Sequence, residues 1–173
     1  TDRYATKEFR RLFAVGEALY VASRSVNDPK FGRTKLAKIL FFSDFIAFTD
    51  LGASITGAEY SKLTNGPFPK GLWSAEKRIA KRGDGALAAT PYFGKDQARL
   101  VPIKPVDLSI FTAEEISLVD QVIEALRDDD AASVSAMSHR APAWLYVEDG
   151  AQIPYALAWV APPQFSEEAD NIG

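Results

Sequence analysis

The sequence predicts a mostly α-helical domain with a small β-hairpin, an α+β fold formed by one compact domain. Apolar residues recur at helical spacing through much of the first half of the 173-residue chain, and again after residue 112. Helix-capping sequences and glycine- or proline-containing breaks separate these stretches. One segment instead places two β-type runs on either side of a glycine turn, as in a β-hairpin.

The first half contains the strongest helical patterns. Apolar side chains form one stripe over residues 9–20, and the Asn-Asp-Pro sequence at residues 27–29 ends this helix. The next predicted helix, residues 34–48, is apolar on nearly every side, so we expect other elements to cover it. Residues 56–59 fit the S/T-x-x-E capping box, which predicts a short helix that carries Tyr60.

The stretch NGPFPKG, residues 65–71, allows two interpretations. It looks like a glycine-rich loop that binds an anion, and it also looks like a stiff elbow between two helices. Pro67 and Pro69 have no backbone N–H to donate to an anion, so the sequence favours the elbow, with Phe68 packed against the core. We expect a helix over residues 72–82 to follow.

A β-hairpin and a capped helix are predicted next. The runs at residues 87–93 and 99–103 flank the turn sequence of residues 94–97, which predicts a short hairpin. Residues 112–115 form a second capping box. The apolar stripe behind it, residues 116–126, predicts an amphipathic helix.

The last part of the chain is predicted to hold one more helix and an apolar segment. Residues 128–130 are three aspartates that break the preceding helix and can cap the next one, residues 131–139. An apolar segment follows at residues 153–160. We predict one domain over residues 1–165 and a polar tail over residues 166–173.

Composition excludes several classes of function. The net charge of −3 argues against broad electrostatic binding to nucleic acid, which requires a concentrated basic surface. The chain has no cysteine and one histidine, so thiolate chemistry is excluded and a zinc site lacks its usual ligands. No apolar run approaches the roughly 20 residues that cross a bilayer. We therefore expect a cytoplasmic protein without a metal, a cofactor or a membrane partner.

Asp44 is a carboxylate inside the nearly continuous apolar helix. A buried carboxylate must be paired or hydrogen-bonded, because an isolated one is strongly destabilising. No basic residue stands at helical spacing from it, so its partner must come from elsewhere; Lys35, Tyr60 and Lys62 have suitable chemistry. A structural pairing is the favoured interpretation, and a functional pocket is the alternative.

His139 is the only histidine and follows Ser138 directly. Neighbouring residues on a helix point about 100° apart, so they rarely form a nucleophile–base pair. The favoured interpretation is a structural histidine near a helix C-terminus, with Trp144 packed beside it. A hydrolase that uses Asp44 and His139 remains an alternative.

A basic cluster lies on the helix that follows the elbow. A solvated helix face is its simplest interpretation, and a surface for an acidic partner or a phosphate backbone is the other. The cluster consists of Lys77, Arg78, Lys81 and Arg82.

Three short runs occur in an order known from one family. Residues 35–44 read KLAKILFFSD, residues 65–69 read NGPFP, and the Ser138-His139 pair stands shortly before Trp144. They resemble the K-L-x-K-L-L-Y-F-A-D, x-G-P-[VF]-P and S-H-x-x-x-x-W runs of the SocA-like antitoxins, the Panacea domain of bacterial and phage toxin–antitoxin loci. Phe42 and Ser43 depart from the family's Y-F-A-D run, and this change is conservative.

This resemblance implies a helical antitoxin, not an enzyme, that neutralises a cognate protein toxin from the same locus by direct binding. It brings no catalytic residues, and we predict none. The alternatives are a nucleic-acid-associated regulatory module that uses the basic helix and, less favoured, the hydrolase. We expect partner specificity to come from the basic cluster and from the hairpin turn at residues 94–97. The motif residues expected to serve as scaffold are Lys35, Asp44, Gly66, Pro67, Ser138, His139 and Trp144.

Overall fold

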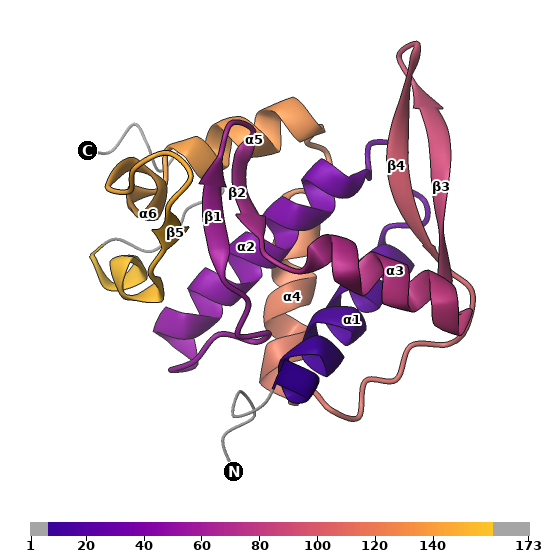
Figure 1. Cartoon of the computed structure of the whole chain (residues 1–173), viewed down its shortest axis with the longest axis horizontal. Coiled ribbons are helices and arrows are strands. Elements are labelled where there is room, and N and C mark those ends of the chain that lie inside the picture. The colour runs from indigo at the N-terminus through magenta and orange to yellow at the C-terminus, as the bar shows by residue number, and fades with distance from the viewer. Residues whose placement is uncertain (1–6, 161–173) are drawn as a thin grey trace.

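The structure, a computed structural model, describes residues 7–160 (Figure 1). Within this range, the chain is mostly helical with two small antiparallel sheets, so the predicted mostly α fold is confirmed. The predicted tail, residues 166–173, lies outside the described residues.

The helices are α1 (Lys7–Arg24), α2 (Arg33–Asp50), α3 (Leu72–Arg82), α4 (Ala113–Ala125), α5 (Ala131–His139), α6 (Pro142–Leu145) and the 3-10 helix η1 (Tyr155–Trp159). The strands are β1 (Tyr60–Leu63), β2 (Gly66–Pro69), β3 (Gly85–Tyr92), β4 (Lys95–Pro102) and β5 (Gln152–Ile153).

Helix α2 forms the centre of the molecule. It contacts α1, α4, α5, β2 and η1, and Figure 1 shows these elements arranged around it. Phe41, Phe42 and Phe45 are fully buried on it. The Phe41 ring contacts both other rings, and Phe41 and Phe45 also contact Tyr60. Burying one such aromatic side chain stabilises a protein by roughly 1.5–3 kcal/mol. The prediction of a central helix covered on most sides is therefore confirmed.

Helices α1 and α4 flank α2, and α4 begins where the sequence predicts. The hydroxyl of Thr112 accepts a hydrogen bond from the Glu115 backbone N–H at 3.1 Å, and the Glu115 carboxylate accepts one from the Thr112 N–H at 2.9 Å. This reciprocal capping box satisfies two backbone donors that the helix itself leaves free. Asp130 caps α5 in a similar way, through a 2.8 Å hydrogen bond from the Ser133 N–H.

The short helix predicted after residues 56–59 is wrong, because Tyr60 begins strand β1. The Thr56 hydroxyl donates to the Asp44 carboxylate and accepts from the Ala58 N–H, so it does not cap a helix. The extended backbone turns Tyr60 into the core, where it is 1% exposed. Tertiary hydrogen bonding has overridden the local capping signal.

The elbow predicted for residues 65–71 is also wrong in form, because most of it is strand β2. Strand β2 pairs with β1 and forms an edge of the three-stranded sheet, where proline's missing N–H is tolerated. Pro67 and Pro69 are buried, whereas Phe68, expected in the core, is only half-buried and contacts Trp73. The stretch leads directly into α3, which has the predicted bounds.

The predicted β-hairpin is present and is longer than expected. Strands β3 and β4 project beyond the helices at the upper right of Figure 1. Phe93 and Gly94 form its turn with φ angles of 49° and 76°, the paired left-handed conformations of a type I′ turn. Residues 95–97, which we expected in the turn, instead belong to β4.

Candidate partner-binding surface and its scaffold

Asp44 is fully buried and links α2 to the segment that leads into β1 through hydrogen bonds. Its Oδ1 accepts backbone hydrogen bonds from Ile55 and Thr56, both at 2.9 Å. Its Oδ2 accepts hydrogen bonds from the Thr56 hydroxyl at 2.5 Å and the Tyr60 hydroxyl at 2.7 Å. Of the three partners expected from the sequence, Tyr60 is the one that binds this carboxylate.

The chemistry around Asp44 is that of a structural group. Burial raises the pKa of the Asp44 carboxyl, while the hydrogen bonds from Thr56 and Tyr60 act in the opposite direction. Its side chain is 0% exposed, and each oxygen already accepts two hydrogen bonds. A reacting group therefore has no route to it in this conformation, and the geometry does not support a hydrolase built on Asp44.

His139 and Trp144 form the packed pair expected from the sequence. Their rings stack with centroids 4.4 Å apart and planes 17° apart. Burial lowers the pKa of His139, and the nearby charges of Lys38 and Lys62 lower it further, so the ring is neutral at pH 7. The Ser138 hydroxyl donates to Ser135 O at 2.7 Å, so its proton is directed along its own helix and not toward His139.

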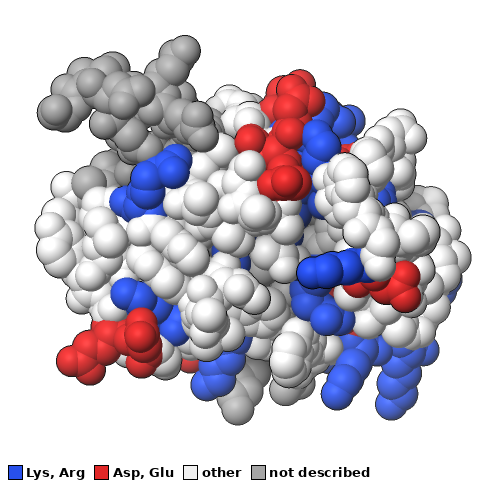
Figure 2. Space-filling model, turned by 90° about the horizontal axis from the view of Figure 1, so that it is seen from above, with Lys and Arg blue, Asp and Glu red and all other residues white. Residues whose placement is uncertain are grey.

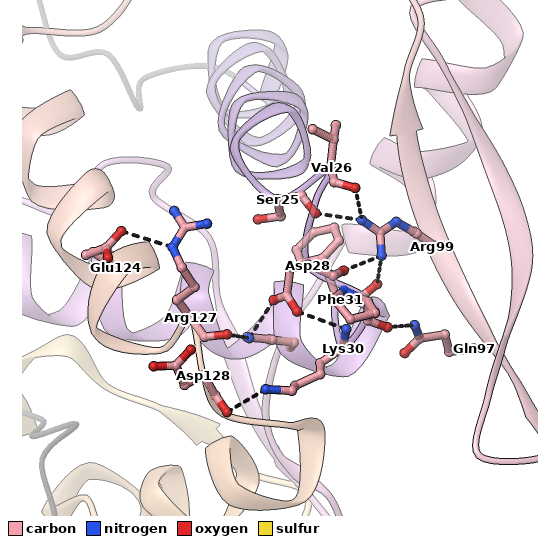
Figure 3. A network of polar contacts seen from close by, with 12 residues as sticks. Ser25, Val26, Asp28, Lys30, Phe31, Gln97, Arg99, Glu124, Arg127 and Asp128 are labelled. Atoms are coloured by element: carbon pink, nitrogen blue, oxygen red, sulfur yellow. Dashed lines mark hydrogen bonds and ion pairs between the residues drawn. The ribbon is translucent and has the colours of Figure 1, made fainter.

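Lys35 forms a buried ion pair at the start of α2. Its Nζ lies 2.7 Å from Asp28 Oδ2 and donates to Arg127 O at 3.2 Å. Nearby, Lys30 donates to the backbone oxygen of Asp128. These contacts fasten the α1–α2 loop to the segment that joins α4 and α5 (Figure 3).

Arg99 on β4 holds the other side of the same loop. Its guanidinium donates to the backbone oxygens of Ser25, Val26, Asp28 and Phe31 at 2.5–3.3 Å, as Figure 3 shows. Arginine suits this task because its donors are fixed in one plane. The base of the projecting hairpin is thereby anchored to the helical body, while its tip extends away from it.

The basic cluster lies on the outer face of α3. Leu72, Ala75 and Ile79 are buried on the inner side of this helix, which packs against α1 and β3. The basic residues at positions 77, 81 and 82 are exposed, whereas Arg78 is half-buried and has a partner. Figure 2 shows several Lys and Arg side chains projecting at the lower right.

The hairpin beside α3 carries exposed apolar side chains. Phe93 at its tip is 89% exposed, and its ring contacts that of Tyr92. Leu87 and Val101 are also exposed along the strands. Helix α3 and strand β3 are neighbours in the fold, and we call the exposed basic residues of α3 together with the exposed residues of the hairpin the α3–hairpin surface.

The structure also reveals a feature that the sequence reasoning missed. A pocket of about 350 Å³ lies between the start of α2, the β1–β2 turn and the start of α3, with Lys38, Gly66 and Trp73 in its wall. Lys38 belongs to the KLAKILFFSD run but was not singled out. The signal available in the sequence was Trp73, a large aromatic residue shortly after the proline-containing GPFP run.

The described part of the chain has neither a metal-binding cluster nor a membrane-spanning helix. Residues 7–160 contain no cluster of three or more His, Cys, Asp or Glu side chains placed to hold a metal ion. Over the same residues, no helix combines the length and apolar character needed to cross a membrane.

The chain matches the family model described as antitoxin SocA-like, Panacea domain, over residues 36–145, which is more than half of its length. The chain therefore belongs to the SocA-like antitoxin family. This membership supports a role in a toxin–antitoxin system, and a regulatory role in place of an enzymatic one. No curated protein and no solved structure gives a significant match.

Proposed function

We propose that this chain is an antitoxin that neutralises a protein toxin encoded at the same locus by binding it directly. The complex forms in the cytoplasm, and the antitoxin turns over no substrate. The proposal extends the family assignment, which indicates the class of system but not the mode of neutralisation.

The observation that carries this proposal is where the family-motif residues lie. Lys35, Asp44 and Ser138 are each 1% exposed or less, and Gly66 and Pro67 are also buried. Lys35, Asp44 and Ser138 are also engaged in hydrogen bonds or an ion pair within the chain, so they hold the fold together and offer no group to a partner. Contacts that differ from one toxin to another must then come from exposed positions outside the motifs.

The α3–hairpin surface supplies such positions. It combines three exposed basic side chains with an exposed phenylalanine on a projecting hairpin. Basic groups at the edge of an interface speed association with an acidic partner, and buried aromatic side chains often contribute most of the affinity. We propose that this surface contacts an acidic face of the toxin.

Charge reversal on α3 tests the proposal. The variant Lys77→Glu, Lys81→Glu, Arg82→Glu leaves the partnered Arg78 intact, so the fold should be kept. We expect it to bind the purified product of the neighbouring gene roughly 10-fold or more weakly, mainly through slower association. The matched control is Lys70→Glu, because Lys70 is 76% exposed and lies outside the surface.

The assay is isothermal titration calorimetry, together with rescue of growth when toxin and antitoxin are expressed together. A wild-type protein that neither binds nor rescues would contradict the proposed function. Equal binding by the wild type and the triple variant would retain the antitoxin and place its contact surface elsewhere.

A further inference from the structure

The pocket between α2 and the β1–β2 turn has an unusual combination of charge and apolar surface. Its volume of about 350 Å³ is within the range of sites that enclose a small ligand or a few side chains. Trp73 and Leu63 on its rim are 62% and 45% exposed, so the pocket is open on that side. Phe68, half-buried, adds a third large apolar side chain.

Lys38 is one of four polar residues in the pocket wall, which also includes Arg33, Thr34 and Asn65. Its side chain is 1% exposed, and its Nζ donates to Pro67 O at 3.0 Å. This is the one acceptor that Nζ has among the described residues, although an ammonium group carries three donors. Burial lowers the pKa of Lys38 to about 8, so the group is still mostly charged at pH 7. A charged amine with unused donors thus lies at the edge of an open pocket.

The other cation of the pocket is already paired. Arg33 binds Glu76 through three hydrogen bonds of 2.8–3.1 Å, and its guanidinium lies 6.0 Å from the centre of the Trp73 ring. The positive charge of Lys38 is therefore the uncompensated one among the residues that line the pocket. A buried charge of this kind is stabilised most by an opposite charge.

Gly66 fixes the position of this lysine. Its φ is +116°, and a Cβ at this position would lie 2.5 Å from Lys38 Cε and 3.0 Å from Nζ. Lys38 therefore lies directly against the backbone of Gly66, and any other residue here would be strained by the positive φ and would displace Lys38. The same backbone approach lets Nζ reach Pro67 O.

Phosphate is a poor candidate for this pocket. A phosphate site normally uses several backbone N–H groups or a free arginine fork. The residues after Gly66 include Pro67 and Pro69, which have no N–H, and Arg33 is bound to Glu76. A single lysine beside three large apolar side chains matches a carboxylate on an apolar segment better.

We propose that this pocket receives a carboxylate of the partner toxin, carried on an apolar segment that covers Trp73 and Leu63. The inference rests on the proposed antitoxin function and names a second contact on the antitoxin, separate from the α3–hairpin surface. A free small carboxylate would leave most of the exposed Trp73 uncovered, so the size of the rim favours a protein segment.

The pocket itself can be tested without the toxin. The probes are indole-3-acetate and its uncharged counterpart indole-3-acetamide, followed through the indole N–H signal of Trp73 by NMR. We expect the carboxylate to bind roughly 10-fold or more tightly than the amide, since a hydrogen bond between charged groups is stronger than a neutral one. The preference should disappear in Lys38→Met and persist in Lys70→Met. Equal binding of both probes, or no binding of either, would overturn the inference that this pocket binds a carboxylate through Lys38.

The docking claim is tested with the purified toxin. Lys38→Met and Trp73→Ala should each weaken the complex roughly 10-fold or more, because each removes a central contact of the pocket. Lys70→Met should leave the affinity unchanged, and circular dichroism melts should show that all three variants fold. A toxin that binds wild type and Lys38→Met equally overturns this inference and leaves the antitoxin function intact. A toxin that does not bind wild type at all overturns both.

Discussion

Replacing Glu17 with methionine is expected to stabilise the protein. Glu17 lies on α1 and is 1% exposed, and neither of its carboxyl oxygens has a hydrogen-bond partner among the described residues. Burial raises the pKa of Glu17 well above its ordinary value, and the nearby charges of Asp44 and Glu115 raise it further. The charged form is therefore disfavoured by burial and by like charges, and the protonated form has no hydrogen-bond partner among the described residues.

The size of the effect follows from the missing partners. A buried polar group without a hydrogen bond costs about 1–3 kcal/mol in the free energy of unfolding. For a protein of this length each kcal/mol shifts the melting temperature by about 2–4 °C, so we expect a rise of roughly 2–12 °C. Methionine is close to glutamate in length and has no group that needs a partner.

The stabilisation should depend on pH in a defined direction. The folded-state pKa of Glu17 is raised above the unfolded value near 4.5, so the folded state holds the proton more tightly. Protonation of Glu17 therefore adds to the free energy of unfolding. This addition is fully present below the unfolded-state pKa and is lost as the pH rises through the folded-state pKa. The advantage of Glu17→Met should therefore be larger at pH 8 than at pH 5.

Urea denaturation at pH 5 and pH 8 measures both effects. The matched control is Glu148→Met, because Glu148 is exposed and its replacement should change stability by no more than about 0.5 kcal/mol. A Glu17→Met variant that is less stable than wild type at both pH values would refute the reasoning, since it would mean that the carboxyl has a stabilising partner.

Three further variants test the scaffold. Asp44→Ala should lower the free energy of unfolding by roughly 3–5 kcal/mol in urea melts, because it leaves buried donors unpaired; a loss below 1 kcal/mol would contradict the assignment. Gly66→Ala should destabilise more than Gly52→Ala in the same melts: both have positive φ, but a Cβ at position 52 meets nothing within 4 Å. Equal losses would mean that the close approach at Gly66 is unimportant. His139→Ala should lower both the melting temperature and toxin binding. The lost stack on Trp144 should reduce the free energy of unfolding by roughly 0.5–1.5 kcal/mol beyond the lost burial. Lost binding at an unchanged melting temperature would instead indicate direct contact.

The helices could be predicted because their signals are local. The apolar stripes of α1 and α4, the capping box at Thr112 and the all-round apolar character of α2 each depend on residues within one element. The need of Asp44 for a buried partner also followed from its apolar neighbours. The sequence offered three candidates for that partner, and the three-dimensional arrangement decides that it is Tyr60.

The errors arose where distant residues decide the local structure. Thr56 has the sequence of a helix cap, yet its hydroxyl binds Asp44, so the following segment becomes a strand. The GPFP run forms an edge strand because β1 lies beside it to pair with. The pocket at Lys38 depends on three elements meeting, and no periodicity within α2 marks that lysine as different from its neighbours.

Direct binding between the purified antitoxin and the purified product of the neighbouring gene is the most decisive measurement. Calorimetry should give a saturable complex of fixed stoichiometry, and the same mixture should have lost the activity of the toxin. Rescue of growth in cells without any complex between the purified proteins would contradict the account, because neutralisation would then proceed by another route.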